Sequence, residues 1–284
     1  MEVTCCKQDG LIGMDRSSLI GVCLSFGSAL VLAQPARSED DADELARKVS
    51  NPASFMISVP VHSDFDFGRW SDGNLFSGSI DIEPVIPFSL NADWNVISHT
   101  DFPFVYSDAA VSGGREFGLG DITQNFSFTP STHGPLIWAL GPQFSFPTAT
   151  RDELGSGKFS MGPSGLLLLQ TKALSIGLSA SQMWSVFGND SRPDVNESEV
   201  QPFIAWHIGK GRTISANLDY SYDWTAETWS LPVSLSFSKI VKLGEQTVSL
   251  SIGGKYWIDP DRNGSQWGIK AGMTFLFPQR TPVQ

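Results

Sequence analysis

The sequence predicts an all-β protein, a transmembrane antiparallel β-barrel of about twelve strands. Three observations support this fold class. Only 17% of the 284 residues are charged, against about 25% in an ordinary soluble domain, yet the mean hydropathy is near zero. Segments along most of the chain alternate apolar and polar residues, and alternately short and long connections join them. After the first forty residues, no apolar run is long enough for a membrane-spanning helix.

The N-terminus, residues 1–33, is predicted to be a signal peptide for export. Residues 19–33 form an apolar stretch of about fifteen residues, which is too short to span a bilayer. Arg16 precedes this stretch, and small residues at its end offer a cleavage site. Two alternatives stay open, namely a true start at Met14 and cleavage after Ser38.

The mature chain divides into three predicted parts. Residues 34–52 form a periplasmic lead-in, whose polar segment 39–50 is expected to form one helical turn. Residues 53–277 form the transmembrane barrel, and residues 278–284 form a C-terminal tail. All cysteines of the chain lie in the leader, so the mature protein would hold no disulfide, thiolate nucleophile or cysteine-based metal site.

Alternation of apolar and polar residues is clearest in four segments, because successive side chains of a strand point to opposite faces. The four segments are residues 174–181, 213–222, 229–238 and 247–256. The run Leu166–Leu169 breaks the alternation, so it is either buried on both faces or in contact with a plug. Earlier segments follow the pattern less cleanly; they are residues 55–61, 79–88, 93–96, 121–128 and 136–146.

A soluble β-sandwich shows the same alternation, and two features favour a barrel instead. No charged residue occurs on the apolar stripes, where a charge at the bilayer midplane would cost about 2–4 kcal/mol. Aromatic residues also recur near strand ends, as in the girdles at membrane interfaces. These aromatic residues are Trp224, Trp229, Tyr256, Trp257 and Trp267.

Connection lengths follow the rule for barrels, in which short periplasmic turns alternate with longer external loops. Twelve strands, an even number, would place both termini in the periplasm. Short turns are predicted near residues 90–91, 131–134, 170–172, 209–211 and 242–245. Longer loops are predicted at residues 62–74, 100–118, 148–157, 188–199 and 259–265, with the shorter connection 223–226 on the same side.

The last predicted strand resembles the assembly signal of outer-membrane barrels. The signal consists of a polar residue, a glycine two positions later, and alternating apolar or aromatic residues that close the strand. Here these residues are Lys270, Gly272, Phe275 and Phe277. The chain departs from the pattern because residues 278–284 follow, whereas many such barrels end on the aromatic residue.

Strand parity predicts a polar lumen lined by eight residues. Asp81 and Glu83 point the same way one strand step apart, and paired carboxylates of this kind can act in acid–base catalysis. In a barrel they more often set the charge of the lumen or pair with inward-facing cations, and that interpretation is preferred. The predicted lumen residues are Asp81, Glu83, Asp93, Asp121, Gln143, Asp219, Lys255 and Lys270.

Other candidate sites fail on their residues, so neither a catalytic residue, a metal nor a cofactor is expected. Residues 154–158 resemble a phosphate loop, but Phe159 stands where Ser or Thr would bind Mg²⁺. His207 faces the lumen by parity, but no serine motif accompanies it, and the four histidines lie at no metal-ligand spacing. A net charge of -11 without a basic stripe argues against nucleic acid as a partner.

Several motifs together carry a family resemblance. They are Gly118–Thr123, Gly141-Pro142 with Pro147–Thr150, Leu154–Lys158 with Gly162-Pro163, Gln201–Phe203, Tyr222–Trp224 with Glu227 and Trp229, and Phe275–Pro278. With them the chain resembles proteobacterial outer-membrane proteins of the phenol-degradation (MetA-pathway) type, often labelled "transporter" or "neuromedin U". The resemblance covers nearly the whole mature chain and implies an outer-membrane barrel related to uptake channels for hydrophobic compounds. It carries over no catalytic or binding residue.

The leading functional hypothesis is passive uptake of small, hydrophobic or aromatic molecules across the outer membrane. A barrel of about twelve strands is small, so a narrow or plugged path is expected. One alternative is a structural or surface-binding barrel without transport. A less favoured one is an outer-membrane lipid hydrolase that uses His207 or His99. Expected partners are outer-membrane lipid, lipopolysaccharide, the barrel-assembly machinery through the last strand, and a small-molecule substrate.

Overall fold

The computed structural model describes residues 39–70, 73–110, 114–132, 134–259 and 264–277. The chain divides into two units, residues 1–34 and 35–284, and the second contains all described residues. The predicted signal peptide, both alternatives for its processing and the predicted tail 278–284 lie outside the described residues.

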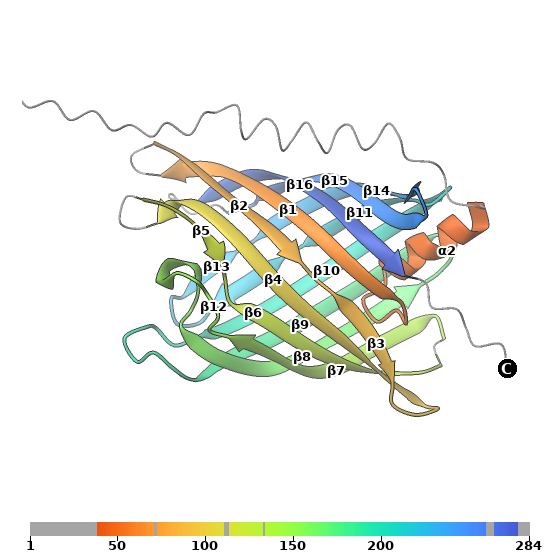
Figure 1. The fold of residues 1–284 in the computed structure, drawn as a ribbon, viewed down its shortest axis with the longest axis horizontal. Helices are drawn as coiled ribbons and strands as arrows, with labels where there is room; N and C mark the ends of the chain where they lie inside the picture. Colours follow the sequence, from red (N-terminus) through yellow and green to blue (C-terminus); the bar gives the residue numbers. More distant parts are fainter. Residues whose placement is uncertain (1–38, 71–72, 111–113, 133, 260–263, 278–284) are drawn as a thin grey trace, which may run out of the picture. The chain divides into compact units, whose positions relative to one another are not determined.

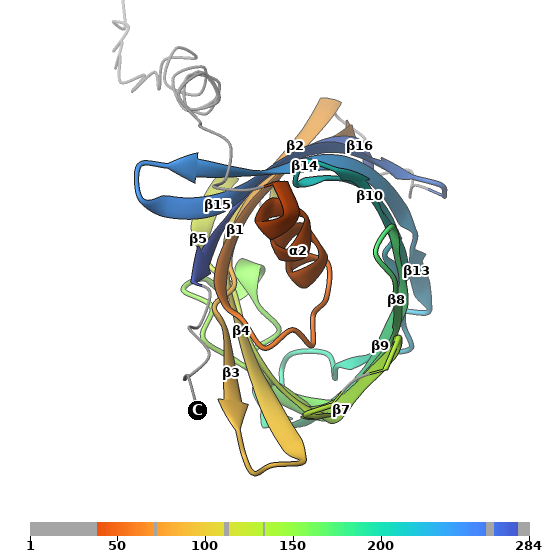
Figure 2. The ribbon, with the colours of Figure 1, turned by 90° about the vertical axis from the view of Figure 1, so that its right-hand side faces the viewer.

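The second unit is one antiparallel sheet whose first and last strands pair, which closes it into a twelve-stranded barrel (Figures 1 and 2). The predicted fold class is confirmed. Four of the twelve strands are interrupted and count as two segments each. The strands are β1 (Ile57–Trp70), β2 (Gly73–Ile82) with β3 (Val85–Ser89), β4 (Trp94–Ala110), β5 (Gly114–Leu119) with β6 (Ile122–Pro130), β7 (Leu136–Phe146), β8 (Lys158–Gln170), β9 (Leu174–Gly188), β10 (Asn196–Gly209), β11 (Arg212–Leu218) with β12 (Tyr220–Asp223), β13 (Thr228–Ser230) with β14 (Pro232–Leu243), β15 (Gln246–Trp257) and β16 (Ser265–Phe277).

The two ends of the barrel differ in their connections. The connections β3–β4, β6–β7, β8–β9, β10–β11 and β14–β15 are tight turns near the predicted positions, and we call their side the short-turn end. The opposite side, which includes the connections 147–157 and 189–195, is the long-loop end. Two predicted loops are wrong, however, because β1 continues to Trp70 and β4 continues to Ala110. On β1 the acidic residues Asp64 and Asp66 are inward-facing strand positions rather than loop residues, and Phe65 between them faces outward.

The outer face of the barrel is apolar and the inner face is polar. On β14 and β15, Leu235 and Ile252 are about 60% exposed, whereas Ser234 and Ser249 on the opposite face are buried. An exposed apolar outer face that extends over many strands is typical of a barrel in contact with lipid. The described residues contain no helix that is long and apolar enough to cross a membrane.

Exposed aromatic side chains cluster towards both ends of the outer face. The rings of Phe67 and Trp267 stack near the long-loop end, with their centroids 4.5 Å apart. Near the short-turn end, the ring centroids of Trp94 and Trp138 are 5.7 Å apart. Of the five aromatic residues assigned to the girdle, Trp257 is a correction. Its ring lies on the inner face, 4.8 Å from the Lys255 ammonium group, because it shares the parity of that lysine.

The lead-in forms the helix α2 (Glu39–Val49), which is eleven residues long rather than one turn. Acidic residues in its first turn and basic residues in its last turn interact favourably with the helix dipole and stabilise the helix. Glu44 and Lys48 form an ion pair of 2.6 Å one turn apart. Ala42 and Ala46 share one face and are buried, so this face is the one that packs on the barrel.

Candidate functional site in the barrel lumen

Helix α2 lies inside the short-turn end of the barrel (Figure 2). The Asp43 carboxylate accepts a 2.6 Å hydrogen bond from the N–H of Gly211, in the β10–β11 turn. The Gln170 side chain on β8 donates a 3.0 Å hydrogen bond to the carbonyl of Arg47. The apolar face of the helix packs in one cluster with the wall; the cluster consists of Ala42, Ala46, Met56, Ile240 and Leu276. The helix therefore narrows this end of the lumen from within.

The chain that follows α2 packs against the opposite inner wall. Ala53 is buried with Ile137, Ala139 and Leu168, and Leu166 and Phe203 pack against this group. Leu168 is fully buried on the inner face, while Leu167 and Leu169 are about half exposed on the outer face. The break in alternation at Leu166–Leu169 is therefore explained by contact with a plug.

Phe203 keeps its place in this group because β9 has a glycine beneath it. A Cβ at Gly177 would lie only 2.2 Å from the Phe203 ring. The glycine thus leaves the volume that the aromatic ring occupies on the neighbouring strand.

At the long-loop end, the connection 147–157 is fastened to the barrel by Asp121. Its carboxylate accepts hydrogen bonds from the N–H groups of Ala149 (3.2 Å) and Ser156 (2.7 Å) and from the Ser156 hydroxyl (2.7 Å). Arg192 also donates to the carbonyl of Gly155 at 2.5 Å. The segment 154–158, which resembles a phosphate loop, belongs to this clamped connection and to the start of β8. The connection contains the short helix η1 (Asp152–Leu154).

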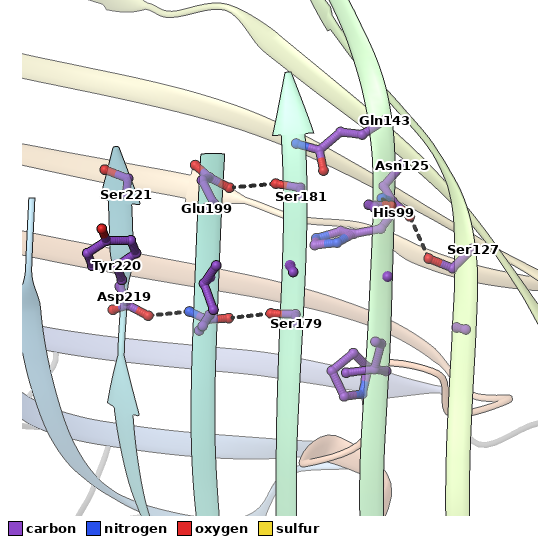
Figure 3. Close-up of a pocket in the computed structure, with 18 of the residues that line it drawn as sticks. His99, Asn125, Ser127, Gln143, Ser179, Ser181, Glu199, Asp219, Tyr220 and Ser221 are labelled. Carbon is purple, nitrogen blue, oxygen red and sulfur yellow. Dashed lines mark hydrogen bonds between the residues drawn. The ribbon is translucent and has the colours of Figure 1, made fainter. Parts of the chain in front are cut away.

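Between the two ends, a large cavity of about 520 Å³ opens on the inner face of β4, β6, β7, β8, β9, β10 and β12. Its labelled side chains in Figure 3 are almost all polar. Glu199 accepts a 3.2 Å hydrogen bond from the Ser181 hydroxyl, and Asp219 accepts one from the amide of Gln201. His99, Asn125 and Gln143 line the same space from other strands (Figure 3); Gln143 is one of the predicted lumen residues.

A smaller cavity of about 270 Å³ is lined by β1, β2 and β16 on its charged side and by β11, β14 and β15 with neutral residues. Its lining includes His62, Asp64, Asp81, Glu83 and Lys270. Lys270 Nζ lies 3.9 Å from an Asp64 carboxylate oxygen. Behind this cavity, the nearly buried Lys255 ammonium group lies 3.0 Å from Asp66 and 3.6 Å from Asp64. Lysines therefore neutralise part of the acidic wall here.

One hydrogen-bonded pair links the two cavities. His99 Nε2 lies 3.0 Å from Glu83 Oε2. His99 lines the large cavity and Glu83 lines the small cavity, so the pair stands at the boundary between them.

Seven of the eight predicted lumen residues lie on the inner side of the barrel. Asp81, Glu83, Gln143, Asp219 and Lys270 line a cavity, and Lys255 is ion-paired on the inner face. Asp121 also lies inside but fastens the connection 147–157.

Asp93 is a correction, because it does not lie on the lumen wall. It is exposed in the β3–β4 turn, where the Asn91 side chain accepts hydrogen bonds from the N–H groups of Asp93 and Trp94. Because Asp93 belongs to this Asx turn, it precedes β4, which begins at Trp94.

The proposed assembly-signal residues all lie on β16. Lys270 and Gly272 face the lumen, and Phe275 and Phe277 lie on the other face, with Phe277 43% exposed. Recognition of this strand by the assembly machinery stays a prediction.

The predicted lumen set lacks several inward-facing acidic residues, because the pattern predicts loops for the segments that contain them. Asp64, Asp66 and Asp101 lie in the strand extensions of β1 and β4, and Glu199 lies in the first half of β10. The signal that identifies them is the uninterrupted alternation itself, as in the run Asp64-Phe65-Asp66-Phe67.

His207 has a serine neighbour, Ser175, that no sequence motif indicates. Ser175 Oγ lies 3.0 Å from His207 Nε2, and Thr213 Oγ1 lies 3.1 Å from the other ring nitrogen. All three residues are buried on the inner face, and Gln170 connects Ser175 to the carbonyl of Arg47 on α2. None of these three residues lines either cavity. They belong to the part of the barrel wall that holds α2, which we call the seat of the helix. Among the described residues, no group of three or more His, Cys, Asp or Glu side chains is arranged to hold a metal ion.

Comparison with known proteins gives a family and a fold. A family model described as "Putative MetA-pathway of phenol degradation" matches residues 71–284. The comparison with curated protein sequences gave no match. Among solved structures, the COG4313 outer membrane channel from Pseudomonas putida F1 has a TM-score of 0.61 at 13% identity, covering 80% of this chain and 99% of that chain. At this identity the likeness shows the fold alone.

Two porins are also similar in structure. The NanC porin has a TM-score of 0.49 at 10% identity, covering 78% of this chain and 100% of its own. The KdgM porin has a TM-score of 0.47 at 12% identity, covering 78% and 99%. These scores are too low to carry an argument about function.

Proposed function

We propose that this chain, which belongs to the family described as "Putative MetA-pathway of phenol degradation", is a narrow passive channel for small molecules in the bacterial outer membrane. The observation that carries the proposal is the large cavity of about 520 Å³, with many polar side chains in its lining, inside a barrel whose outer face is apolar. A barrel that only anchored itself in lipid would have no need of such a space. The fold that carries this cavity is shared with an outer membrane channel.

The substrates we propose are small hydrophobic or aromatic molecules that carry a polar group. The family description names phenol degradation. The large cavity has a mixed lining, in which Ile97 and Leu166 accompany Asn125 and Gln143. Such a lining gives apolar contact to a ring and hydrogen bonds to its polar substituent.

We expect a narrow path through the barrel, because both of its ends are partly filled. Helix α2 occupies the short-turn end, which we assign to the periplasm, and the clamped connection 147–157 lies at the other end. We therefore expect a small conductance, with wider openings when α2 leaves its seat.

Single-channel recording of the refolded protein in a planar bilayer tests the proposal. The channel predicts discrete openings, which small aromatic solutes such as phenol block in a concentration-dependent way. A matched barrel that retains residues 53–277 but lacks α2 should conduct more. A folded protein that never conducts and takes up no aromatic solute into liposomes contradicts the channel.

The clamped loop and the seated helix also favour a second candidate, a structural or surface-binding barrel without transport. Both ends would then be closed permanently, and the connection 147–157 would be a fixed surface feature. This candidate predicts no permeability in liposomes and a weakened cell envelope when the gene is deleted. The recording described above separates the two functions.

A further inference from the structure

The carboxylates of the large cavity have no cationic partner. Glu199 and Asp219 line this cavity, and their observed hydrogen-bond donors, Ser181 and Gln201, are neutral. Among the described residues, no lysine or arginine forms an ion pair with either carboxylate. The small cavity differs, because Lys270 and Lys255 lie beside its carboxylates.

The strands around the large cavity explain this lack of cations. Strands β4, β6, β7, β9, β10, β12 and β13 contain neither lysine nor arginine in their sequences. Strand β14 contributes only its first residue, Pro232, to the lining, and its lysines, Lys239 and Lys242, lie towards its other end. Strand β8 contributes Lys158, but its ammonium group is nearly buried at the long-loop end, where it lies 3.1 Å from Asp194. No basic side chain on these strands is therefore free to offset Glu199 and Asp219.

The two carboxylates lie near each other on one wall of the cavity. Glu199 projects from β10, and Asp219 directly precedes β12, which pairs with β10. Figure 3 shows both carboxylates on this wall, and the Asp219 carboxylate accepts a hydrogen bond from the Gln201 amide. His99, Asn125 and Gln143 face the same space from β4, β6 and β7. A solute in the cavity thus meets two negative charges together and neutral hydrogen-bonding groups elsewhere.

We infer that the large cavity selects cations, so that small solutes bearing an ammonium group pass or bind in preference to anions of similar size, with Glu199 and Asp219 as the residues that determine this specificity. The inference rests on the proposed function and deepens it by naming the charge of the preferred solute. The physical cause is electrostatic, because low-dielectric walls concentrate the field of unpaired charges in the cavity. A solute with an aromatic ring and an ammonium group makes apolar contacts with the cavity wall and is attracted to the carboxylates.

The test compares reversal potentials in a KCl gradient for the intact protein and the Glu199→Gln/Asp219→Asn variant. The intact channel should favour K⁺ over Cl⁻. Each carboxylate removed should lower the permeability ratio about fivefold, which corresponds to ~1 kcal/mol, the interaction of two unit charges about 4 Å apart in water. The matched control is Asp190→Asn/Glu245→Gln, which removes one aspartate and one glutamate from exposed turns and should leave the ratio unchanged.

Binding of a cationic probe separates this inference from the channel function. Benzyltrimethylammonium and benzoate are titrated by calorimetry into the protein in an uncharged detergent. Binding of the cation by the intact protein and the control, with loss in Glu199→Gln/Asp219→Asn, supports the inference even if the barrel does not conduct. Conductance without cation preference, or a preference and probe affinity that the double variant retains, overturns the inference and leaves the channel proposal standing. Migration of the folded and heat-denatured forms in a gel verifies that each variant is folded.

Discussion

The carboxylate of Asp43 accepts a 2.6 Å hydrogen bond from the main-chain N–H of Gly211, which joins the helix that precedes the barrel to a turn in its second half. Gly211 has a φ of 66°, a conformation that places its N–H towards the lumen without strain for a glycine. A Cβ at this position would also lie 3.0 Å from Ala42 and from Ile240. The turn is therefore fitted to the helix by both its shape and its hydrogen bond.

Substitution of Asp43 by Ala should increase the time that the channel spends open. A hydrogen bond to a charged group contributes about 1.5–3 kcal/mol, so the helix should leave its seat about tenfold more often or more. Single-channel open probability is the measurement. Asp40→Ala is the control, because Asp40 is acidic, exposed and in the same first turn of α2. Equal effects of both variants would show that the Gly211 contact does not hold the helix.

Replacing His99 by Ala should raise the unitary conductance. The imidazole stands between the two cavities, 3.0 Å from Glu83, and its removal joins their volumes. Ser127→Ala serves as the comparison, since Ser127 lines the large cavity but donates only to the neighbouring Asn125. A conductance that stays the same in His99→Ala would mean that the path does not run past this pair.

Substitution of Asp121 by Ala should release the connection 147–157. Its carboxylate is the acceptor for two main-chain N–H groups, those of Ala149 and Ser156. Loss of a charge-assisted bond of about 1.5–3 kcal/mol should speed the exchange of both amide hydrogens about tenfold or more. Hydrogen–deuterium exchange measures this directly, with Asp190→Asn as a control at an exposed turn. Unchanged exchange of Ala149 and Ser156 would argue that other contacts hold the loop.

Gly177→Ala should destabilise the barrel by about 1–3 kcal/mol, the usual cost of overpacking. The new methyl group would lie 2.2 Å from Phe203, which is held by the cluster around Ala53. Gly254→Ala is the matched control, because it is also a strand glycine and its nearest atom would be 3.8 Å away. Urea unfolding of both refolded variants gives the comparison. An equal midpoint for the two variants would contradict the packing described.

The Lys158 ammonium group hydrogen-bonds to Asp194 and attracts its charge, and with a hydrogen bond from Ser185 it lowers the pKa of that carboxyl below its ordinary value. A carboxyl whose folded pKa is lowered contributes stability that is present above the unfolded value, near pH 4, and is lost as the pH falls through the folded pKa. In Lys158→Gln, an NMR titration should show the pKa of Asp194 close to its ordinary value. A pKa that is the same in both proteins would sink this assignment.

Most of the fold follows from local patterns in the sequence, and the failures have one cause. The segments 213–222 and 247–256 alternate cleanly with serine and threonine on the inner face, and both are strands. Residues 62–67 also alternate, but with aspartate on the inner face, and a charged segment of this kind predicts a loop. Aspartate can therefore occupy the inner face of the barrel where a lysine, such as Lys255, forms an ion pair with it.

The site is less predictable because it depends on register. That Lys270 and Asp81 face the lumen follows from parity alone. That His99 meets Glu83, or that Gln201 donates a hydrogen bond to Asp219, depends on which residues of neighbouring strands stand side by side. The seat of α2 combines Gln170, Gly211 and Leu276, which come from distant parts of the chain and have no common pattern.

The pairing of Ile57 with Phe277 has a consequence for how the molecule is made. Neighbouring strands along the chain can form hairpins early, but this seam joins the first strand to the last and needs the entire sheet to be present. Contacts between such distant residues are slow to form, because the chain entropy of closing a long loop must be overcome first. Helix α2 ends only a few residues before Ile57, so it is carried to the seam with the first strand. The helix needs no threading through a finished ring, because the residues that join it to β1 hold it at the rim of the barrel.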